Sequence, residues 1–250
     1  MNQASVYLWM MAFTRAGGLV TLMPVFSGKS VPMQLRVAIA AFLGFAGAAM
    51  VKVPVAVPTE LIGLILSTIH EMLIGLLMGL AVRMIFFAVE MAGQMLSTEI
   101  GLSVSSQIDP ISQNNSTVVG SALFMFASLL FLISGSHHEC ILAFVRSFEL
   151  VPPGAGAFHR GAGELFVQTT GSIFLQALQM TAPLMAMNFV VTLSFAVLSK
   201  AAPGVNAFAE SFAVRITAGL TLLALSLGLT AQLVLSQLRQ SPELMLRMIP

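Results

Sequence analysis

Apolar blocks alternate with short polar or proline-rich breaks along the whole chain. At 1.5 Å per residue, most of these blocks approach or exceed the ~30 Å thickness of a bilayer's hydrocarbon core. They also lack the apolar–polar alternation of a soluble amphipathic helix. The pattern predicts an all-α integral membrane protein with about six to eight helical segments. The blocks cover approximately residues 6–26, 35–51, 61–101, 118–133, 141–151, 165–198 and 212–238.

The composition agrees with a membrane protein and excludes several other classes. The 250 residues are 57% hydrophobic and only 8% charged, whereas a soluble domain carries about a quarter charged residues. The net charge is +1 and the basic residues are scattered, so no basic stripe is available for nucleic acid. Cys140 is the only cysteine, which excludes an internal disulfide and a cysteine metal cluster.

The third apolar block is too long for one perpendicular membrane crossing and contains several charges. As a helix from Leu61 to about Gly101 it would extend roughly 60 Å. A charge at the centre of a bilayer costs ~2.5–3.5 kcal/mol even on the most lenient scale. The charged side chains of this block should therefore face protein neighbours or water rather than lipid. They are Glu71, Arg83, Glu90 and Glu99.

Gly75 and Gly79 of the same block have the spacing of a small-residue pair that permits close contact between helices. The alternative is that both are ordinary glycines, since glycine is common in membrane helices. In the last third, Pro183 predicts a kink. The short turn at Pro203-Gly204 predicts that the two flanking segments form an antiparallel hairpin.

The most polar stretch, residues 103–117, contains a single charge, Asp109. Pro110 biases Asp109 away from helix, and the serine and asparagine side chains favour local hydrogen bonds to the backbone. The stretch can be interpreted as an ordinary turn exposed to water. It can also be interpreted as an obstruction in a pore, because irregular backbone at membrane depth must be buried in protein or line a water-filled cavity.

We find no pattern that indicates catalysis, a metal site or a cofactor. His137 and His138 are adjacent, whereas a metal pair on a helix needs a spacing of three or four residues. His70-Glu71 begins like a zinc-protease pattern but has Ile74 at the position of the second histidine. A small-solute transporter is a more serious alternative, because transporters also use intramembrane charges and proline-interrupted helices.

The segment from Ile100-Gly101-Leu102-Ser103 to Asp109-Pro110 resembles the "GLS…DP" segment of the FliR family, the export-gate proteins of bacterial flagella and related type III secretion systems. Two departures concern the last hairpin, where Lys200 replaces the usual arginine and Ser211-Phe212-Ala213 replaces "GFP". Further agreement, in the same order, occurs at Arg15, Pro24, Val31-Pro32, Arg36, Ile74 to Gly79, Gly135, His137, Pro152, Gly154, Ala202-Pro203, Asn206 and Phe208.

The resemblance implies a non-enzymatic subunit of the flagellar protein-export gate in the bacterial inner membrane, within the basal body, with no cofactor. Residues 1–155 would be a part similar to FliP, and residues 156–250 a hairpin similar to FliQ. FliP- and FliQ-like subunits would form the pore with this chain, FlhB- and FlhA-like proteins would adjoin it, and unfolded substrates would pass through. A virulence-type export gate is the alternative within the same family.

Two sets of residues acquire roles through this resemblance. Polar residues of the long helices would contact other subunits, and these are Glu71, Arg83, Glu90, Glu99 and Lys200. The polar stretch would plug the idle pore with Ser106, Gln107, Ile108, Asp109, Pro110, Ile111, Ser112, Gln113, Asn114, Asn115 and Ser116.

Overall fold

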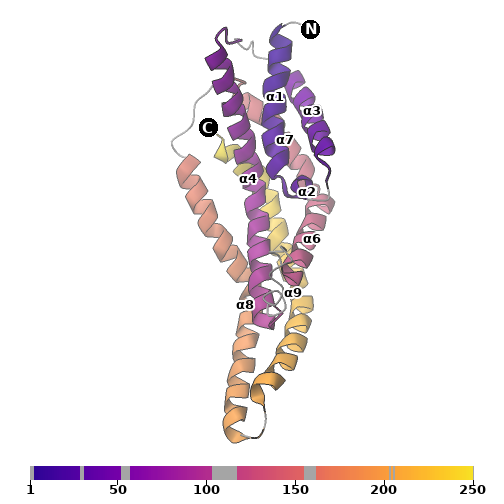
Figure 1. The fold of residues 1–250 in the computed structure, drawn as a ribbon, viewed down its shortest axis with the longest axis vertical. Helices are drawn as coiled ribbons and strands as arrows, with labels where there is room; N and C mark the ends of the chain where they lie inside the picture. Colours follow the sequence, from indigo (N-terminus) through magenta and orange to yellow (C-terminus); the bar gives the residue numbers. More distant parts are fainter. Residues whose placement is uncertain are drawn as a thin grey trace. The chain divides into compact units, whose positions relative to one another are not determined.

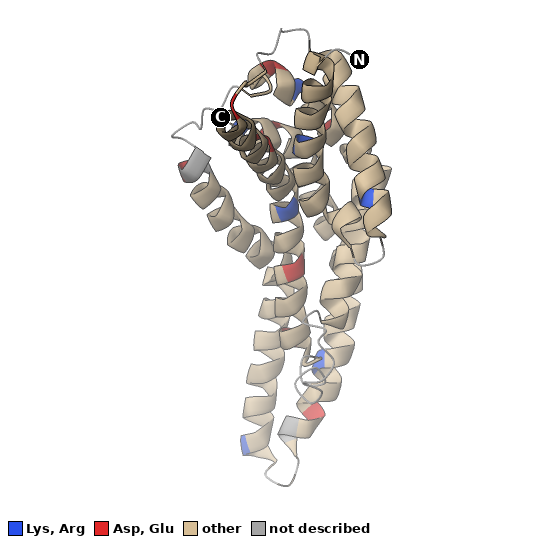
Figure 2. Cartoon of the chain, turned by 45° about the horizontal axis from the view of Figure 1, so that its top comes forward, with Lys and Arg blue, Asp and Glu red and all other residues tan. Residues whose placement is uncertain are grey.

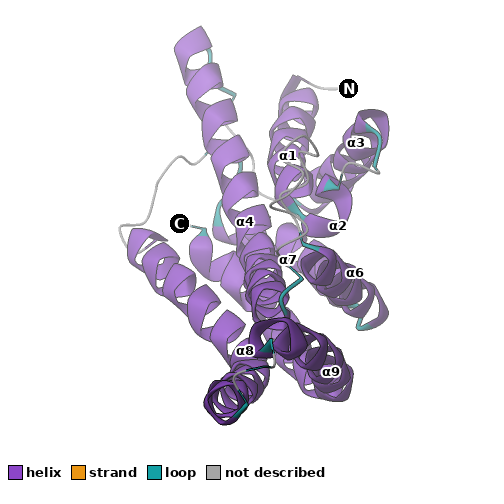
Figure 3. Ribbon diagram, turned by 60° about the horizontal axis from the view of Figure 1, so that its bottom comes forward, coloured by secondary structure: helices purple, strands orange, loops and turns teal. Residues whose placement is uncertain are grey.

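The structure is a computed structural model of the chain, and it describes residues 3–28, 31–51, 57–102, 117–154, 162–202, 204 and 206–249. These ranges are built from helices joined by short turns, and no strand occurs in them (Figure 3). The prediction of an all-α protein is confirmed. The proposed plug residues, Ser106 to Ser116, lie outside the described ranges.

The helices cover the predicted apolar blocks, but the last helix (Ala207–Met248) begins five residues before its block and ends ten residues after it, past Pro242. Pro24 ends the first one, because proline has no N–H and holds Met23 in an extended conformation. Pro183 lies inside α8 without ending it. The helices are α1 (Gln3–Leu22), α2 (Pro24–Ser27), α3 (Met33–Met50), α4 (Leu61–Ile100), α6 (Val118–Ile133), α7 (Ser136–Leu150), α8 (Ala162–Ala201) and α9 (Ala207–Met248).

Four of these helices, α3, α4, α8 and α9, are long and apolar enough to cross a membrane. The pair α6 and α7 forms a fifth candidate, a span broken at a sharp bend where Gly135 has a φ of +73°. Charged residues are few along the whole ribbon (Figure 2). The protein is therefore an all-α membrane protein.

The chain divides into two compact units, neither of which is continuous in sequence. The first combines Met1–Ile85, Phe131–Thr170 and Gln237–Pro250, and the second combines Phe86–Leu130 and Gly171–Ser236. Each unit thus takes segments from both sides of residue 155. The predicted FliP-like and FliQ-like parts are defined by resemblance to two other proteins, which these compact units do not test. That division therefore stays a prediction.

In the first unit, α1 packs along α3 and against the first half of α4, with α7 beside α3 (Figure 1). The contact between α1 and α4 is close because both helices present glycine. A Cβ atom on Gly18 would lie 2.7 Å from Met72 O, and one on Gly75 would collide with Arg15 O. Gly79 meets the carbonyl of Leu19 one turn further along α4. Only glycine allows the two backbones to approach this closely.

In the second unit, α8 and α9 form the predicted antiparallel hairpin, in which α8 ends at Ala201 and α9 begins at Ala207 (Figure 1). Arg215 Nη2 of α9 donates a hydrogen bond to Thr192 Oγ1 of α8, at 3.1 Å. The second half of α4 crosses the start of α6 at Gly93 and Gly120, where a Cβ on Gly93 would collide with Gly120 Cα.

The adjacent glycines Gly17 and Gly18 provide a matched test of the contact between α1 and α4. We expect Gly18→Ala to destabilise the fold by about 1–3 kcal/mol, because the new methyl group overlaps the backbone of α4 at Met72 and Leu76. A Cβ on Gly17 meets no described atom within 4 Å, so Gly17→Ala should be neutral or stabilise by up to ~1 kcal/mol through helix propensity. Thermal unfolding in detergent, followed by circular dichroism, measures both, and equal midpoints for the two variants would contradict the close packing.

Candidate functional site

The main polar feature of the first unit is a completely buried ion pair. Arg15 Nε of α1 donates a hydrogen bond to Glu71 Oε2 of α4 at 2.6 Å. Both side chains are 0% exposed. Each charge is the partner of the other, although 56 positions separate them in the sequence.

The remaining polar groups of the pair bind two further segments. Arg15 Nη1 donates to Ser147 Oγ of α7 at 3.0 Å, and Arg15 Nη2 donates to the Val151 carbonyl at 3.0 Å. The second carboxylate oxygen, Glu71 Oε1, accepts a hydrogen bond from Gly154 N at 3.1 Å. Gly154 has a φ of +82°, a left-handed conformation in which glycine is unstrained. One buried cluster therefore joins α1, α4, α7 and the turn that follows α7.

Aromatic and hydroxyl groups complete the surroundings of Arg15. The guanidinium carbon lies 4.2 Å from the ring centroid of Phe148, a distance at which a cation is attracted to the face of an aromatic ring. Ser147 Oγ in turn donates to the Phe144 carbonyl at 2.6 Å. Burying an ion pair is costly, but the cost is offset when the remaining hydrogen-bonding groups also find partners, and here both Nη atoms and the second carboxylate oxygen each have one.

The cluster has the properties of a structural lock rather than a reactive site. Neither charge reaches the surface, so no substrate has access to them. Its members come from segments up to 136 positions apart, and each hydrogen bond fixes one of those segments against another. The arrangement determines how α1, α4 and α7 pack, and with it the shape of the first unit.

This finding differs from the expectation for Glu71. Glu71 was predicted to contact another subunit, and it is instead buried and paired within its own chain. The prediction rested on the requirement that a charge in an apolar helix avoids lipid. Pairing with Arg15 meets that requirement. The sequence offered one signal for this pair: Arg15 is the only charge in its apolar block, and Glu71 is the first of several charges in another.

The other charges assigned to contacts between subunits occupy varied environments. Arg83 and Glu90 are half-buried, and Lys200 is exposed at the end of α8. Glu99, also half-buried, accepts a hydrogen bond from Asn188 Nδ2, which joins α4 to α8 in the second unit. Contacts of these four residues with other subunits stay predictions.

The two ends of the polar stretch are held by recognisable helix caps. At the end of α4, Leu102 N donates to Ser97 O at 2.9 Å and Gly101 N to Thr98 O at 3.1 Å, with Gly101 at a φ of +88°. This is a Schellman motif, which needs a left-handed residue and therefore favours glycine. At the start of α6, Thr117 Oγ1 accepts a hydrogen bond from Gly120 N at 3.1 Å and so caps that helix.

The contact of Gly93 with Gly120 also places the two ends of the stretch on adjoining helices of the second unit. Thr117 Oγ1 further donates to the Gly93 carbonyl, at 3.4 Å. The structure thus fixes where the stretch leaves α4 and where it enters α6.

The histidines at the bend before α7 form a small aromatic cluster. The rings of His137 and His138 are 3.9 Å apart between centroids, and His137 lies 6.2 Å from Phe131. Within the described ranges, no three His, Cys, Asp or Glu residues are placed to hold a metal ion together.

Removing one member of the buried pair should be far more damaging than removing one member of an exposed pair. We expect Glu71→Gln to destabilise the protein by roughly 3–5 kcal/mol, because it leaves the Arg15 charge buried without a counter-charge. The matched control is Glu243→Gln, which breaks the Arg247–Glu243 pair of α9, whose side chains are 66% exposed. Such surface pairs contribute about 0–1 kcal/mol to stability, so Glu243→Gln should destabilise the protein by no more than that.

The double variant Arg15→Met with Glu71→Leu should recover much of the loss, since it leaves no unpaired charge. Unfolding by denaturant in a mild detergent measures all three variants. A Glu71→Gln protein as stable as Glu243→Gln would show that the pair does not hold the helices together.

Comparison with known proteins extends over nearly the whole chain. Residues 6–241 match the family described as "Bacterial export proteins, family 1". The flagellar biosynthetic protein FliR of Caulobacter vibrioides is 30% identical over 224 residues, which are 89% of each chain. The FliR protein of Escherichia coli is 28% identical over a match that covers 91% of this chain and 86% of the relative. The FliR protein of Bacillus subtilis is 26% identical over a match that covers 86% of this chain and 84% of the relative. The resemblance noted in the sequence is confirmed, and the chain belongs to family 1 of the bacterial export proteins, with FliR proteins among its relatives.

Proposed function

We propose that this chain is a non-enzymatic subunit of the flagellar type III protein-export gate. In this proposal it forms a pore with FliP- and FliQ-like subunits in the bacterial inner membrane, within the flagellar basal body. FlhB- and FlhA-like proteins adjoin the pore, and unfolded flagellar substrates pass through it.

The observation that carries the proposal is the match to export proteins over residues 6–241. The relatives named above are called flagellar biosynthetic proteins, and this chain covers 84–89% of their length. Their names favour the flagellar system over a virulence-type gate. They also favour an export role over the transport of small solutes.

The burial of the long helices supports a subunit that is completed by neighbours. The apolar window of α4 is 61% buried within the chain, whereas those of α8 and α9 are only 11% and 22% buried. Lipid could cover these apolar faces, but the hairpin also exposes the charged residues Lys200 and Glu210. Charged side chains favour protein or water over lipid.

A groove of about 530 Å³ along the hairpin supports the same conclusion. On α9 its lining residues lie on successive turns of one helix face, and they include Val214, Thr217, Ala218, Thr221 and Leu225. Thr217 and Thr221 each donate their hydroxyl hydrogen to a carbonyl one turn earlier, Ala213 O and Thr217 O. These hydroxyls therefore require no external partner. Small residues in such a stripe let another helix approach closely.

The polar stretch from Ser106 to Ser116 is proposed as the plug of the idle pore. Its support is its composition, which is rich in hydrogen-bonding groups but contains only one charge, Asp109. Such a segment can pack against apolar walls without the full cost of burying charges. The caps at Gly101 and Thr117 support the proposal as well, because they provide fixed ends for a segment that would move.

Isolation of the chain from membranes tests the assembly. We expect FliP- and FliQ-like proteins to copurify with it in constant ratio, and the chain to be less stable when it is expressed without them. The measurement is quantitative mass spectrometry of the purified material, with a peptide tag on this chain. A homo-oligomer that binds a small solute would instead support a transporter and contradict the proposal.

Deletion of Gln107–Asn115 tests the plug. We expect the assembled complex with this deletion to make the membrane permeable to small ions, measured as leakage or as loss of membrane potential. Asp109→Ala is the matched control and should have a smaller effect, because one residue is not expected to hold the pore closed alone. Unchanged permeability in a complex of normal composition would contradict the plug and leave the export-gate assignment intact.

A further inference from the structure

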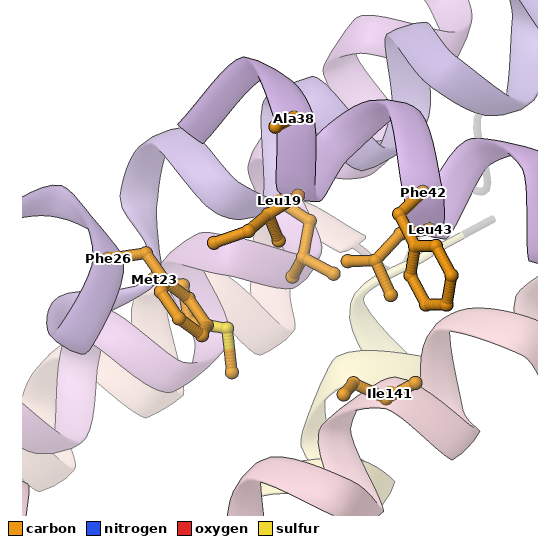
Figure 4. Close-up of a pocket in the computed structure, with 8 residues that line it drawn as sticks. Leu19, Met23, Phe26, Ala38, Phe42, Leu43 and Ile141 are labelled. Carbon is orange, nitrogen blue, oxygen red and sulfur yellow. The ribbon is translucent and has the colours of Figure 1, made fainter. Parts of the chain in front are cut away.

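The first unit contains an apolar groove to which the proposed export function assigns no role. It has a volume of about 360 Å³ and lies between α3 and the bend from α1 to α2, with α7 on the other side. Leu19, Phe26, Phe42, Leu43 and Ile141 are among its lining residues, all of which are apolar. In Figure 4, Leu19, Met23 and Leu43 gather on one side and Ile141 of α7 lies across from them. Phe42 is 72% exposed, so the groove is open along the edge of α3.

Arg36 is the cation nearest in sequence to the groove. Arg36 is the fourth residue of α3, and its Nη2 donates to the Gly28 carbonyl at 2.6 Å, just beyond Phe26. No carboxylate pairs with its guanidinium in the ranges that the structure describes. Most of the donors of Arg36 therefore remain available for an anion.

Helix geometry places this cation at one end of the groove. Arg36, Ile39 and Leu43 are three and four residues apart and share one face of α3. The lining residue Leu43 lies ~10 Å along the helix axis from Arg36. α3 has 18 residues and is a candidate membrane span, so it extends roughly 27 Å, close to the thickness of the hydrocarbon core. Arg36, near its first residue, is then at the level of the lipid headgroups.

We propose that this groove is a binding site for one anionic phospholipid, with an acyl chain against Leu19, Phe42 and Ile141 and the phosphate on Arg36. An acyl chain needs only apolar contacts, which is what the lining offers. Arginine binds phosphate through charge-assisted hydrogen bonds. A wholly apolar groove with one cation at the headgroup level matches the two parts of a phospholipid, its acyl chain and its phosphate.

The site can be tested by the retention of lipid on the full-length chain in a mild detergent. Native mass spectrometry with added dioleoyl phosphatidylglycerol or phosphatidylcholine gives the affinity for each lipid. We expect phosphatidylglycerol to bind about tenfold more tightly, because its phosphate is not neutralised, whereas the choline cation of phosphatidylcholine cancels the phosphate charge and repels Arg36. Arg36→Gln should abolish this preference and Arg36→Lys should retain it. Arg146→Gln, at an exposed arginine of α7, is the control and should change nothing.

A second variant tests the apolar part of the site. Ala38 lines the groove and is exposed, so Ala38→Trp should fill the groove without disturbing the core and should weaken the binding of both lipids. A preference for phosphatidylglycerol that survives Arg36→Gln would overturn the proposal, as would unchanged lipid binding in Ala38→Trp. Complete competition by inorganic phosphate would indicate an anion site without an acyl groove. Loss of a copurifying protein from Ala38→Trp, with lipid binding intact, would indicate a protein partner. Competition by phosphate and loss of a protein partner would each overturn the proposal as well.

Discussion

Arg15 and Glu71 are opposite charges in two apolar helices, and neither could be buried without the other. An unpaired charge in such a position would have to reach water or lose its ionisation, and either would pull its helix out of the packing. Paired, the two side chains occupy the centre of the first unit at 0% exposure. Their remaining groups bind Ser147, the Val151 carbonyl and Gly154 N. Four segments are held at a single point.

The pair depends on the glycines beside it. Glu71, Gly75 and Gly79 are four residues apart and lie on one face of α4. Gly75 lies against the backbone of Arg15, and Gly79 against that of Leu19. Because no side chain separates the two backbones at these positions, the guanidinium of Arg15 can reach the carboxylate one turn away. A larger residue at Gly75 would separate the helices and lengthen the 2.6 Å contact. Close packing and charge pairing are therefore one constraint rather than two.

The second unit has a different character. It contains the α8–α9 hairpin, whose long apolar windows are mostly exposed, and the capped ends of the polar stretch. Its glycines serve the crossing of α4 with α6 and the left-handed cap at Gly101. A firmly locked unit and a hairpin with uncovered faces together suit a subunit whose packing is completed by other proteins, as the proposed export gate requires. In the site proposed beside Arg36, a phospholipid would likewise cover an apolar face that the chain leaves open.

The sequence by itself determined the membrane class, the positions of the helices, the break at Pro24 and the hairpin around residues 202–206. Helices depend on apolar blocks, prolines and hydrogen bonds between residues four apart, and all of these can be read locally. Its ordered motifs also identified the family. Only the tertiary structure decided that Arg15 meets Glu71, 56 positions away, and that both meet the turn at Gly154. Which faces of two helices meet depends on the packing of every helix around them, and the sequence pattern of one helix does not contain that information.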